Sequence, residues 1–180
     1  MQKIIQKFKI DGQEIIFRYP KESDWKSILK LTISLFEEGA MVGFNTKPTK
    51  KDTCESLAKK LKSIKKKEMV YLVCDVAGQV KGRAWIKKNT SDCLGHIGDL
   101  GIHLGKDIRG KGVGDKLLKA IIKEAKKVLK IKIITLDVSA ENNAAINLYE
   151  KNGFVKNGII KGGFKYYKRF MDVIPMVRYL

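Results

Sequence analysis

Residues 96–151 pass twice from a strand pattern to a helix pattern, and few folds accommodate that order. Residues 96–104 and 131–138 are apolar runs with strand character, whereas residues 112–129 repeat leucine and isoleucine at helical spacing. A shorter helical pattern follows over residues 142–151. A strand, a helix and a second strand in this order predict two parallel neighbours in one sheet, with the helix packed across them.

The segments on either side predict antiparallel strands and two more helices. Asp11-Gly12 and Ala77-Gly78-Gln79 each separate two strand-like runs, which is the pattern of a hairpin. The expected elements are an added strand before Asp11, strands at 14–19, 69–76 and 80–87, a helix from Ser23 or Asp24 to about Glu38, a helix at 49–67, and two strands within 154–180. We therefore expect one domain over residues 1–180, an α/β (α+β) fold whose mixed, mostly antiparallel sheet holds a central parallel pair flanked by helices.

Composition limits the class of protein further. A chain of 180 residues that is 44% apolar can bury a real core, which excludes a disordered chain. Three cysteines without C-x-x-C spacing support neither a disulfide framework nor a zinc site, so we expect reduced thiols and no metal. The first residues lack the apolar run of a signal peptide, and no stretch approaches a membrane span. We expect a cytoplasmic protein without membrane association.

The chain is strongly basic, with 37 lysine and arginine residues against 19 aspartate and glutamate residues, a net charge of +18. Such a charge attracts anionic partners, among them phosphorylated cofactors, RNA and acidic protein surfaces. Many of the lysines fall on the polar face of the predicted helix at 112–129, which is typical of a solvated surface. No aromatic-interleaved basic patch accompanies them. Docking on RNA or the ribosome and assembly as a homodimer stay open.

A glycine-rich turn joins the predicted strand at 96–104 to the helix that follows. Its sequence, Arg-Gly-Lys-Gly-Val-Gly at 109–114, leaves main-chain N–H groups uncovered at a helix start, where they favour an anion such as a pyrophosphate. Arg109 and Lys111 add positive charge. The Walker spacing is absent, and Asp115 stands where a dinucleotide fingerprint has its last glycine. A loop that only turns the chain is the remaining alternative.

The stretch at 104–118 closely resembles the acetyl-CoA loop of the GNAT superfamily of N-acetyltransferases, whose pattern is [Q/R]-x-x-G-x-[G/A]. A second block at 142–154, NNAAINLYEKNGF, resembles the family pattern N-x-x-A-x-x-L-Y-x-x-x-G-F. Two motifs in the right order are more specific than either alone. The resemblance covers residues 18–180 and leaves only the N-terminal hairpin outside. The end of the chain resembles the branch that contains amino-acid and ribosomal-protein N-acetyltransferases.

The resemblance implies acetyl-CoA as the acetyl donor and places it on particular residues. It implies main-chain contacts to pantetheine from Ile102, His103 and Leu104, a pyrophosphate site at Arg109, Gly110, Lys111, Gly112, Val113, Gly114 and Asp115, and a hydrogen bond from Asn142 to the cofactor arm. On its own, Asn142 also fits the N-cap of the helix that it precedes.

The same likeness implies the reacting groups. Tyr149 would be the general acid for the departing thiolate, and its alternative is a core aromatic residue. Strand alternation places Asp99, Gly101 and His103 on one face. Where a family branch often carries glutamate this chain has Asp99, one methylene shorter, which favours action through a water or no catalytic role. His103, a lone strand histidine, is more typically packed and hydrogen-bonded.

The acceptor is expected to be a primary amine that attacks the thioester directly. Deprotonation at pH 7 costs about 4.6 kcal/mol for a lysine-like amine and about 1.4 kcal/mol for an α-amine. Because the sequence offers no strong general base, the lower cost of deprotonation favours the α-amine of an amino acid or of a protein N-terminus as the acceptor. Residues 36–44 border the acceptor site by family likeness, where Glu37 and Glu38 are either an acidic pocket or a helix end. The competing hypothesis is a basic module on the same fold that binds CoA, RNA or the ribosome without catalysis.

Overall fold

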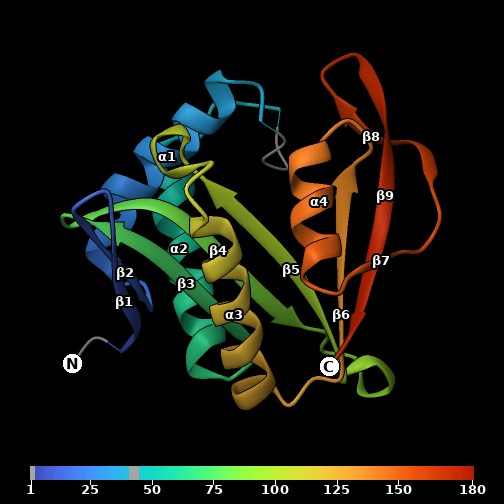
Figure 1. Cartoon of the computed structure of the whole chain (residues 1–180), viewed down its shortest axis with the longest axis horizontal. Coiled ribbons are helices and arrows are strands. Elements are labelled where there is room, and N and C mark those ends of the chain that lie inside the picture. The colour runs from blue at the N-terminus through green and yellow to red at the C-terminus, as the bar shows by residue number, and fades with distance from the viewer. Residues whose placement is uncertain (1–2, 41–44) are drawn as a thin grey trace.

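The computed structural model describes residues 3–40 and 45–180, and within them every strand belongs to one sheet. The helices are α1 (Trp25–Glu37), α2 (Lys50–Lys65), α3 (Val113–Leu129) and α4 (Asn143–Lys151). The strands are β1 (Ile4–Ile10), β2 (Gln13–Arg18), β3 (Met69–Val76), β4 (Gln79–Lys88), β5 (Ile97–Leu104), β6 (Ile133–Ser139), β7 (Val155–Lys156), β8 (Ile160–Tyr166) and β9 (Arg169–Tyr179). The sheet order is β1-β2-β3-β4-β5-β6-β9-β7, with β8 paired to β9 (Figure 1).

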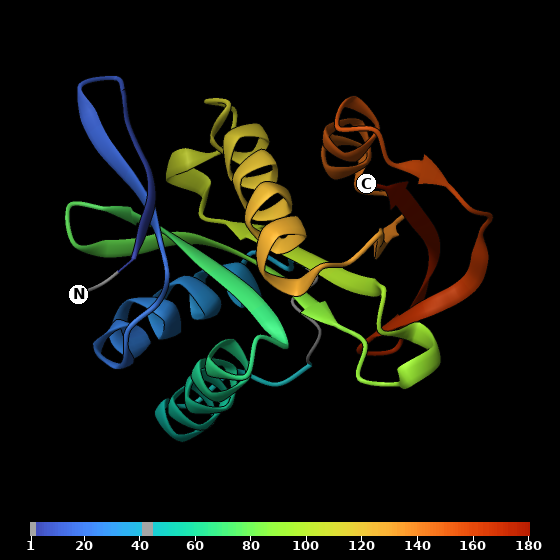
Figure 2. The same cartoon turned by 90° about the horizontal axis from the view of Figure 1, so that it is seen from below.

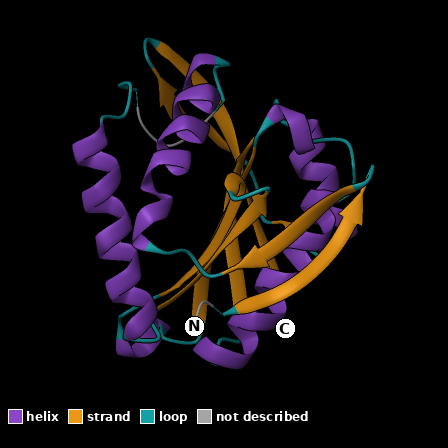
Figure 3. Cartoon of the chain, turned by 90° about the vertical axis from the view of Figure 1, so that its left-hand side faces the viewer, coloured by secondary structure: helices purple, strands orange, loops and turns teal. Residues whose placement is uncertain are grey.

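Helices cover both faces of this sheet (Figures 2 and 3). Strand β3 is buried along its whole length because successive side chains enter opposite layers. On one face Val70 and Leu72 pack in the cluster that holds the apolar side of α3 and the buried residues of α4. On the other face Tyr71 and Val73 pack with the apolar residues of α1 and with Leu57 of α2. The predicted mixed α/β architecture is confirmed.

The central strands β5 and β6 run parallel but stay together only briefly. They pair over three positions, from Ile97 with Ile133 to Asp99 with Thr135. Beyond these positions the two strands diverge toward their carboxyl ends, as Figure 1 shows. All other strand pairs among the described residues are antiparallel. The sheet is therefore split beyond Asp99 and Thr135, and we call this region, where the backbones of β5 and β6 no longer pair, the wedge.

The predicted hairpin before the resemblance region is confirmed as β1 and β2. Its turn holds Asp11 and Gly12 at positive φ, 49° and 77°. The hairpin lies against α3, where the Lys116 ammonium sits 5.3 Å from the centre of the Phe8 ring. Its turn also reaches the glycine-rich loop, because Asp11 Oδ2 is 3.1 Å from Lys111 Nζ.

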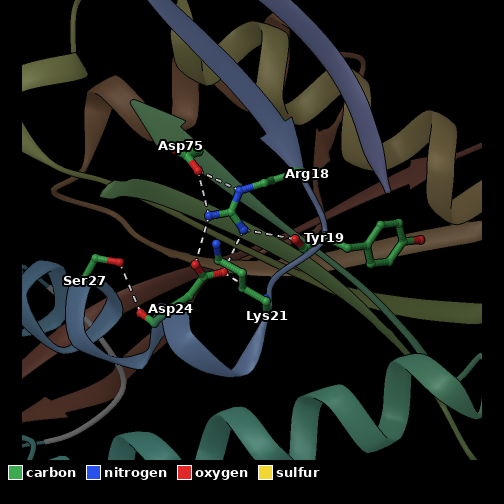
Figure 4. A network of polar contacts seen from close by, with 6 residues as sticks. All are labelled: Arg18, Tyr19, Lys21, Asp24, Ser27 and Asp75. Atoms are coloured by element: carbon green, nitrogen blue, oxygen red, sulfur yellow. Dashed lines mark hydrogen bonds and ion pairs between the residues drawn. The ribbon is translucent and has the colours of Figure 1, made fainter. Parts of the chain in front are cut away.

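A buried ion network joins β2 and β3 to the start of α1 (Figure 4). Arg18 donates through Nη1 and Nη2 to both carboxylate oxygens of Asp24, at 2.7 and 2.9 Å, and through Nε to Asp75 at 2.7 Å. Asp24 also accepts from the main-chain N–H of Lys21. Sequence analysis expected Ser23 or Asp24 to cap α1 with its side chain. Asp24 is the N-cap residue of α1, but its carboxylate accepts no N–H of α1, because it binds Arg18 and the Lys21 N–H that precedes it.

The other predicted boundaries differ little from the structure. Thr49 caps α2 in a reciprocal box with Asp52, and α3 begins directly after Gly112. In the region after Phe154 we expected two strands, and the structure has three. The additional strand, β7, pairs with β9 and is only two residues long. A strand of that length is too short to show a hydrophobic period in the sequence. No helix within the described ranges is both long and apolar enough to cross a membrane.

Candidate functional site

The glycine-rich loop presents main-chain N–H groups to solvent. Gly110 and Gly112 have positive φ angles of 72° and 74°, and a Cβ at either position would meet no atom within 4 Å. The N–H groups of Gly110, Lys111 and Gly112 have no acceptor among the described residues. Gly112 is the N-cap of α3 and offers no side chain to cover the first turn. The geometry is that of an anion site formed by backbone amides and the helix dipole.

The charged side chains of this loop are already engaged within the protein. Arg109 donates from Nε to the Leu104 carbonyl at 2.8 Å, and its guanidinium pairs with Glu38 at the end of α1. Lys111 pairs with Asp11. Asp115 accepts hydrogen bonds from Lys119 and Asn152, which lower the pKa of its carboxyl group. What the loop offers to an anion is therefore its main chain.

Gly114 and Val113 have a packing role in this arrangement. A Cβ at Gly114 would lie 3.1 Å from Leu104 Cδ1 and 3.4 Å from Leu148 Cδ2, so glycine lets α3 start close to β5 and α4. Val113 is fully buried in the core beneath the loop. Both residues support the position of the amides ahead of them.

The three residues expected to contact pantetheine lie in the part of β5 that faces the wedge. Ile102, His103 and Leu104 pair with β4 along one strand edge and have no β6 partner along the other. The Leu104 carbonyl is occupied by Arg109. The wedge therefore opens along main-chain groups that an extended ligand can pair with, as a missing strand would.

Tyr149 and Asn142 lie at the α4 side of the wedge. The Tyr149 side chain packs on Phe154, with 5.7 Å between ring centres, and only 6% of the residue is exposed. Burial raises the pKa of Tyr149 to about 12. Its hydroxyl has no hydrogen-bond partner among the described residues. It is also not among their side-chain polar atoms that are both fully buried and unpaired, so the hydroxyl is in contact with solvent. Asn142 caps α4, its Oδ1 accepting from the Ala145 N–H at 3.1 Å.

Asp99 stands on β5 at the point where the wedge begins. Its pKa is raised, first by desolvation and then by the negative charge of Asp137 on β6, and Lys87 on β4 offsets part of that shift. A carboxylate with a raised pKa is a stronger base than an ordinary one. The residue keeps substantial solvent exposure, so a water molecule has access to it.

A cavity of about 380 Å³ lies between α1, α2 and the face of the sheet that carries Asp99, Gly101 and His103. Its lining includes Lys60, Tyr71, Arg83, Trp85 and His103, and Asp99 is not part of it. Gly101 is required here because a Cβ would come within 2.1 Å of the Trp85 ring. The indole thus lies over β5 and contacts the His103 ring edge-on, 5.2 Å between centres.

His103 is a neutral hydrogen-bonding group in this cavity. Its Nδ1 lies 3.3 Å from Arg83 Nε and 3.2 Å from a terminal nitrogen of the same guanidinium. Arginine can only donate, so Nδ1 accepts and the proton of the neutral ring is on Nε2. Burial, followed by the positive charges of Arg83, Lys60 and Arg109, lowers the pKa of His103 to about 3. His103 is therefore a donor at Nε2 rather than a base.

Sequence analysis missed the cationic character of this cavity. Arg83 is buried in β4 between two buried residues, and no motif in the sequence distinguishes it or shows that α2 covers this face of the sheet. Glu37 and Glu38, which sequence analysis considered as either an acidic pocket or a helix end, each form an ion pair. Glu37 pairs with Lys47, while Glu38 pairs with Arg109 of the glycine-rich loop. Residues 41–44, also expected to border the acceptor, lie outside the described residues.

Comparison with known proteins agrees with this geometry. Residues 23–154 match the model of the acetyltransferase (GNAT) family. An uncharacterised N-acetyltransferase of Methanocaldococcus jannaschii is 32% identical over 111 residues, which are 59% of this chain. The match spans 48% of that relative, so the chain corresponds to about half of its length.

Solved structures share the fold. A ribosomal-protein-alanine N-acetyltransferase from Brucella melitensis superimposes with a TM-score of 0.80 at 24% identity, covering 91% of this chain and 99% of that one. A GNAT-family acetyltransferase from Streptococcus pneumoniae gives 0.77 at 25% identity, covering 92% and 99%. A putative acetyltransferase from Salmonella typhimurium, solved with its cofactor acetyl-CoA, gives 0.81 at 20% identity, covering 92% and 94%.

Proposed function

The chain belongs to the GNAT family of acetyltransferases, and on that premise we propose that it transfers the acetyl group of acetyl-CoA to a primary amine. The resemblance carried by the two sequence motifs is thereby confirmed at the level of the family. The observation that carries the proposal is the continuity between the wedge at β5 and β6 and the bare amides that follow it. A long, thin donor with a diphosphate fits this continuous path.

Acetyl-CoA suits the residues that are present. The amides of Gly110, Lys111 and Gly112 would hold the pyrophosphate, and the open glycine positions let that group approach the backbone. The free edge of Ile102 and His103 would pair with pantetheine. The acetyl-CoA-bound relative from Salmonella typhimurium has the same fold, which supports this assignment.

Two side chains would then serve the reaction. Asp99, which lies outside the cavity lining, would accept the proton of the attacking amine through intervening water, because its raised pKa makes it a better base. Tyr149 would donate a hydrogen bond to the sulfur as negative charge develops there. With a pKa of about 12 the phenol stays protonated at neutral pH, and hydrogen-bond donation costs less than full transfer of its proton. The acceptor ammonium would lose two protons in all: Asp99 would take the first and release it to solvent, and the second, lost from the nitrogen after attack, would end on the CoA thiolate.

The acceptor enters from the cavity between α1 and α2. Its volume of about 380 Å³ suits a small molecule or the end of a peptide. The α-amine of an amino acid or of a protein N-terminus is the substrate class that we propose. The Brucella relative, whose name states that it acetylates alanine of a ribosomal protein, supports an α-amine.

The test compares two glycines with similar positive φ angles, 74° at Gly112 and 78° at Gly78. Gly112→Glu places an acidic side chain in the proposed pyrophosphate site, whereas Gly78→Glu does so in the β3–β4 turn, at φ 78° and equally in open space. We expect acetyl-CoA to raise the melting temperature of the parent and of the Gly78 variant, and not that of the Gly112 variant. Amine-dependent release of CoA thiol should follow the same pattern. Equal acetyl-CoA binding by all three proteins would refute the proposal.

A further inference from the structure

Arg83 is a buried cation without an acidic partner. Only 7% of the residue is exposed, and no carboxylate lies within ion-pair distance of it among the described residues. Its neighbours are the neutral His103 ring, the Trp85 face at 6.0 Å and the Tyr71 hydroxyl. Arg18, the other deeply buried arginine, is held by two carboxylates. A buried charge that lacks such compensation is costly.

A second cation increases the positive charge of the same cavity. Lys60 of α2 donates to Ser56 Oγ at 2.6 Å and lies 5.7 Å from the centre of the Tyr71 ring. Burial, and then the charge of Arg83, lowers the pKa of Lys60 to about 8. His103 contributes a third donor at Nε2. One side of the cavity therefore holds three donors with excess positive charge.

The acid in the cavity lining does not neutralise this group. Asp52 is exposed, and its Oδ2 accepts from both the N–H and the hydroxyl of Thr49 in the cap of α2. The Asp52 carboxylate therefore binds the N-terminal cap of α2 rather than the cations of the cavity. The cavity keeps a positive site for which the chain supplies no counter-ion among the described residues.

We propose that Arg83, together with Lys60 and His103, binds the carboxylate of a free amino acid whose α-amine is acetylated. The inference rests on the proposed function and narrows its acceptor. In an amino acid one carbon separates the amine from the carboxylate, so the two groups must be bound close together. His103 meets this condition, because its side chain lines the cavity while its main chain borders the wedge. A protein N-terminus has a neutral amide in place of that carboxylate and leaves Arg83 uncompensated.

The experiment uses matched acceptors that differ only in the acidic group. Each of several amino acids is compared with its α-amide, its decarboxylated amine and a dipeptide that begins with it. Acetyl-CoA-dependent thiol release gives kcat/KM for each. We expect the parent to prefer the acid over the amide by at least about tenfold, the effect of a charge-assisted hydrogen bond. Amides or dipeptides that react as well as the acids would overturn the inference.

Variants identify the residues that make this preference. Arg83→Gln should lower kcat/KM for the acids about 10- to 100-fold and leave the amides nearly unchanged, which removes the preference. Lys60→Met, on the partly exposed face of α2, should reduce the preference with little risk to folding. Arg178→Gln, in β9 and outside the cavity lining, is the matched control and should keep it. An equal loss for acids and amides in Arg83→Gln would contradict carboxylate binding.

A direct measurement separates this inference from the proposed function. Sodium acetate is titrated into the free protein while NMR follows the His103 ring, in the parent and in Arg83→Gln. A saturable change in the chemical shift of the His103 ring, seen in the parent and not in Arg83→Gln, supports the anion site. If no acceptor is acetylated in that case, only the proposed acetyl transfer is contradicted. The anion site is refuted if amino acids and their amides are acetylated equally well, or if the His103 ring signal does not respond to acetate. Neither result contradicts the proposed acetyl transfer.

Discussion

His103 shows how one side chain couples the cavity to the stability of the fold. Its ring is held neutral between Trp85 and Arg83, and its pKa of about 3 lies below the ordinary value of 6.5. Below pH 6.5 the unfolded chain takes up a proton at this residue that the folded chain refuses. The contribution of neutral His103 to stability is therefore complete above about pH 6.5 and is lost as the pH falls toward 3.

This residue predicts a specific pH dependence. Between pH 6.5 and pH 4 the unfolding free energy should fall by about 1.4 kcal/mol per pH unit because of His103 alone. His103→Gln removes that contribution, so the difference between parent and variant should shrink as the solution becomes more acidic. His96→Gln, at an exposed histidine, is the control. Urea unfolding at a series of pH values measures it, and parallel curves for the parent and His103→Gln would contradict the neutral ring.

Tyr149 permits a test of chemistry apart from folding. Because its hydroxyl has no protein partner among the described residues, Tyr149→Phe should change stability by less than about 0.5 kcal/mol. Loss of the proposed hydrogen bond to sulfur should lower kcat about 100-fold while acetyl-CoA binds as before. Tyr179→Phe, at a residue 72% exposed, is the control. Unchanged turnover would leave Tyr149 as a core aromatic residue.

At the level of helices and strands, Arg18 and its two acids position α1 against the sheet. Asp24→Asn removes a bidentate partner and leaves a buried guanidinium poorly compensated, so unfolding should become easier by about 3 kcal/mol. Glu37→Gln breaks the exposed pair with Lys47 and should cost less than about 1 kcal/mol. Urea denaturation of both variants measures the two costs. Equal losses of unfolding free energy in the two variants would show that the buried network stabilises the fold no more than an exposed ion pair does.

Helices and strands were predictable where the signal is local. The apolar period of α3 and the Asp11-Gly12 turn each depend on a few neighbouring residues, and each is found as expected. The two motifs located the glycine loop and α4 for the same reason. Edge strand β7 escaped prediction because its pairing with β9, rather than its own sequence, defines it.

The cationic cavity could not be predicted in this way because its parts are distant in the chain. Lys60, Tyr71, Arg83 and His103 come from α2, β3, β4 and β5, and no short pattern relates them. The same holds for Glu38 and Arg109, which are 71 residues apart and connect α1 to the loop after β5. The motifs located the part of the candidate site that we propose for the acetyl donor, whereas the cavity that we propose for the acceptor depends on how α1 and α2 cover the sheet.

Over the whole molecule, the charge of +18 should favour anionic acceptors during approach as well as in the cavity. Glutamate, alanine and lysine share the α-amine and α-carboxylate but carry net charges of opposite sign or none, so they separate approach from recognition. Raising the salt concentration from about 20 mM to about 300 mM screens charges beyond a few ångströms. We expect kcat/KM to fall about threefold for glutamate, to rise for lysine and to change least for alanine. A parallel change for all three would mean that the overall field has no part in acceptor choice, and that the groups lining the cavity decide it alone.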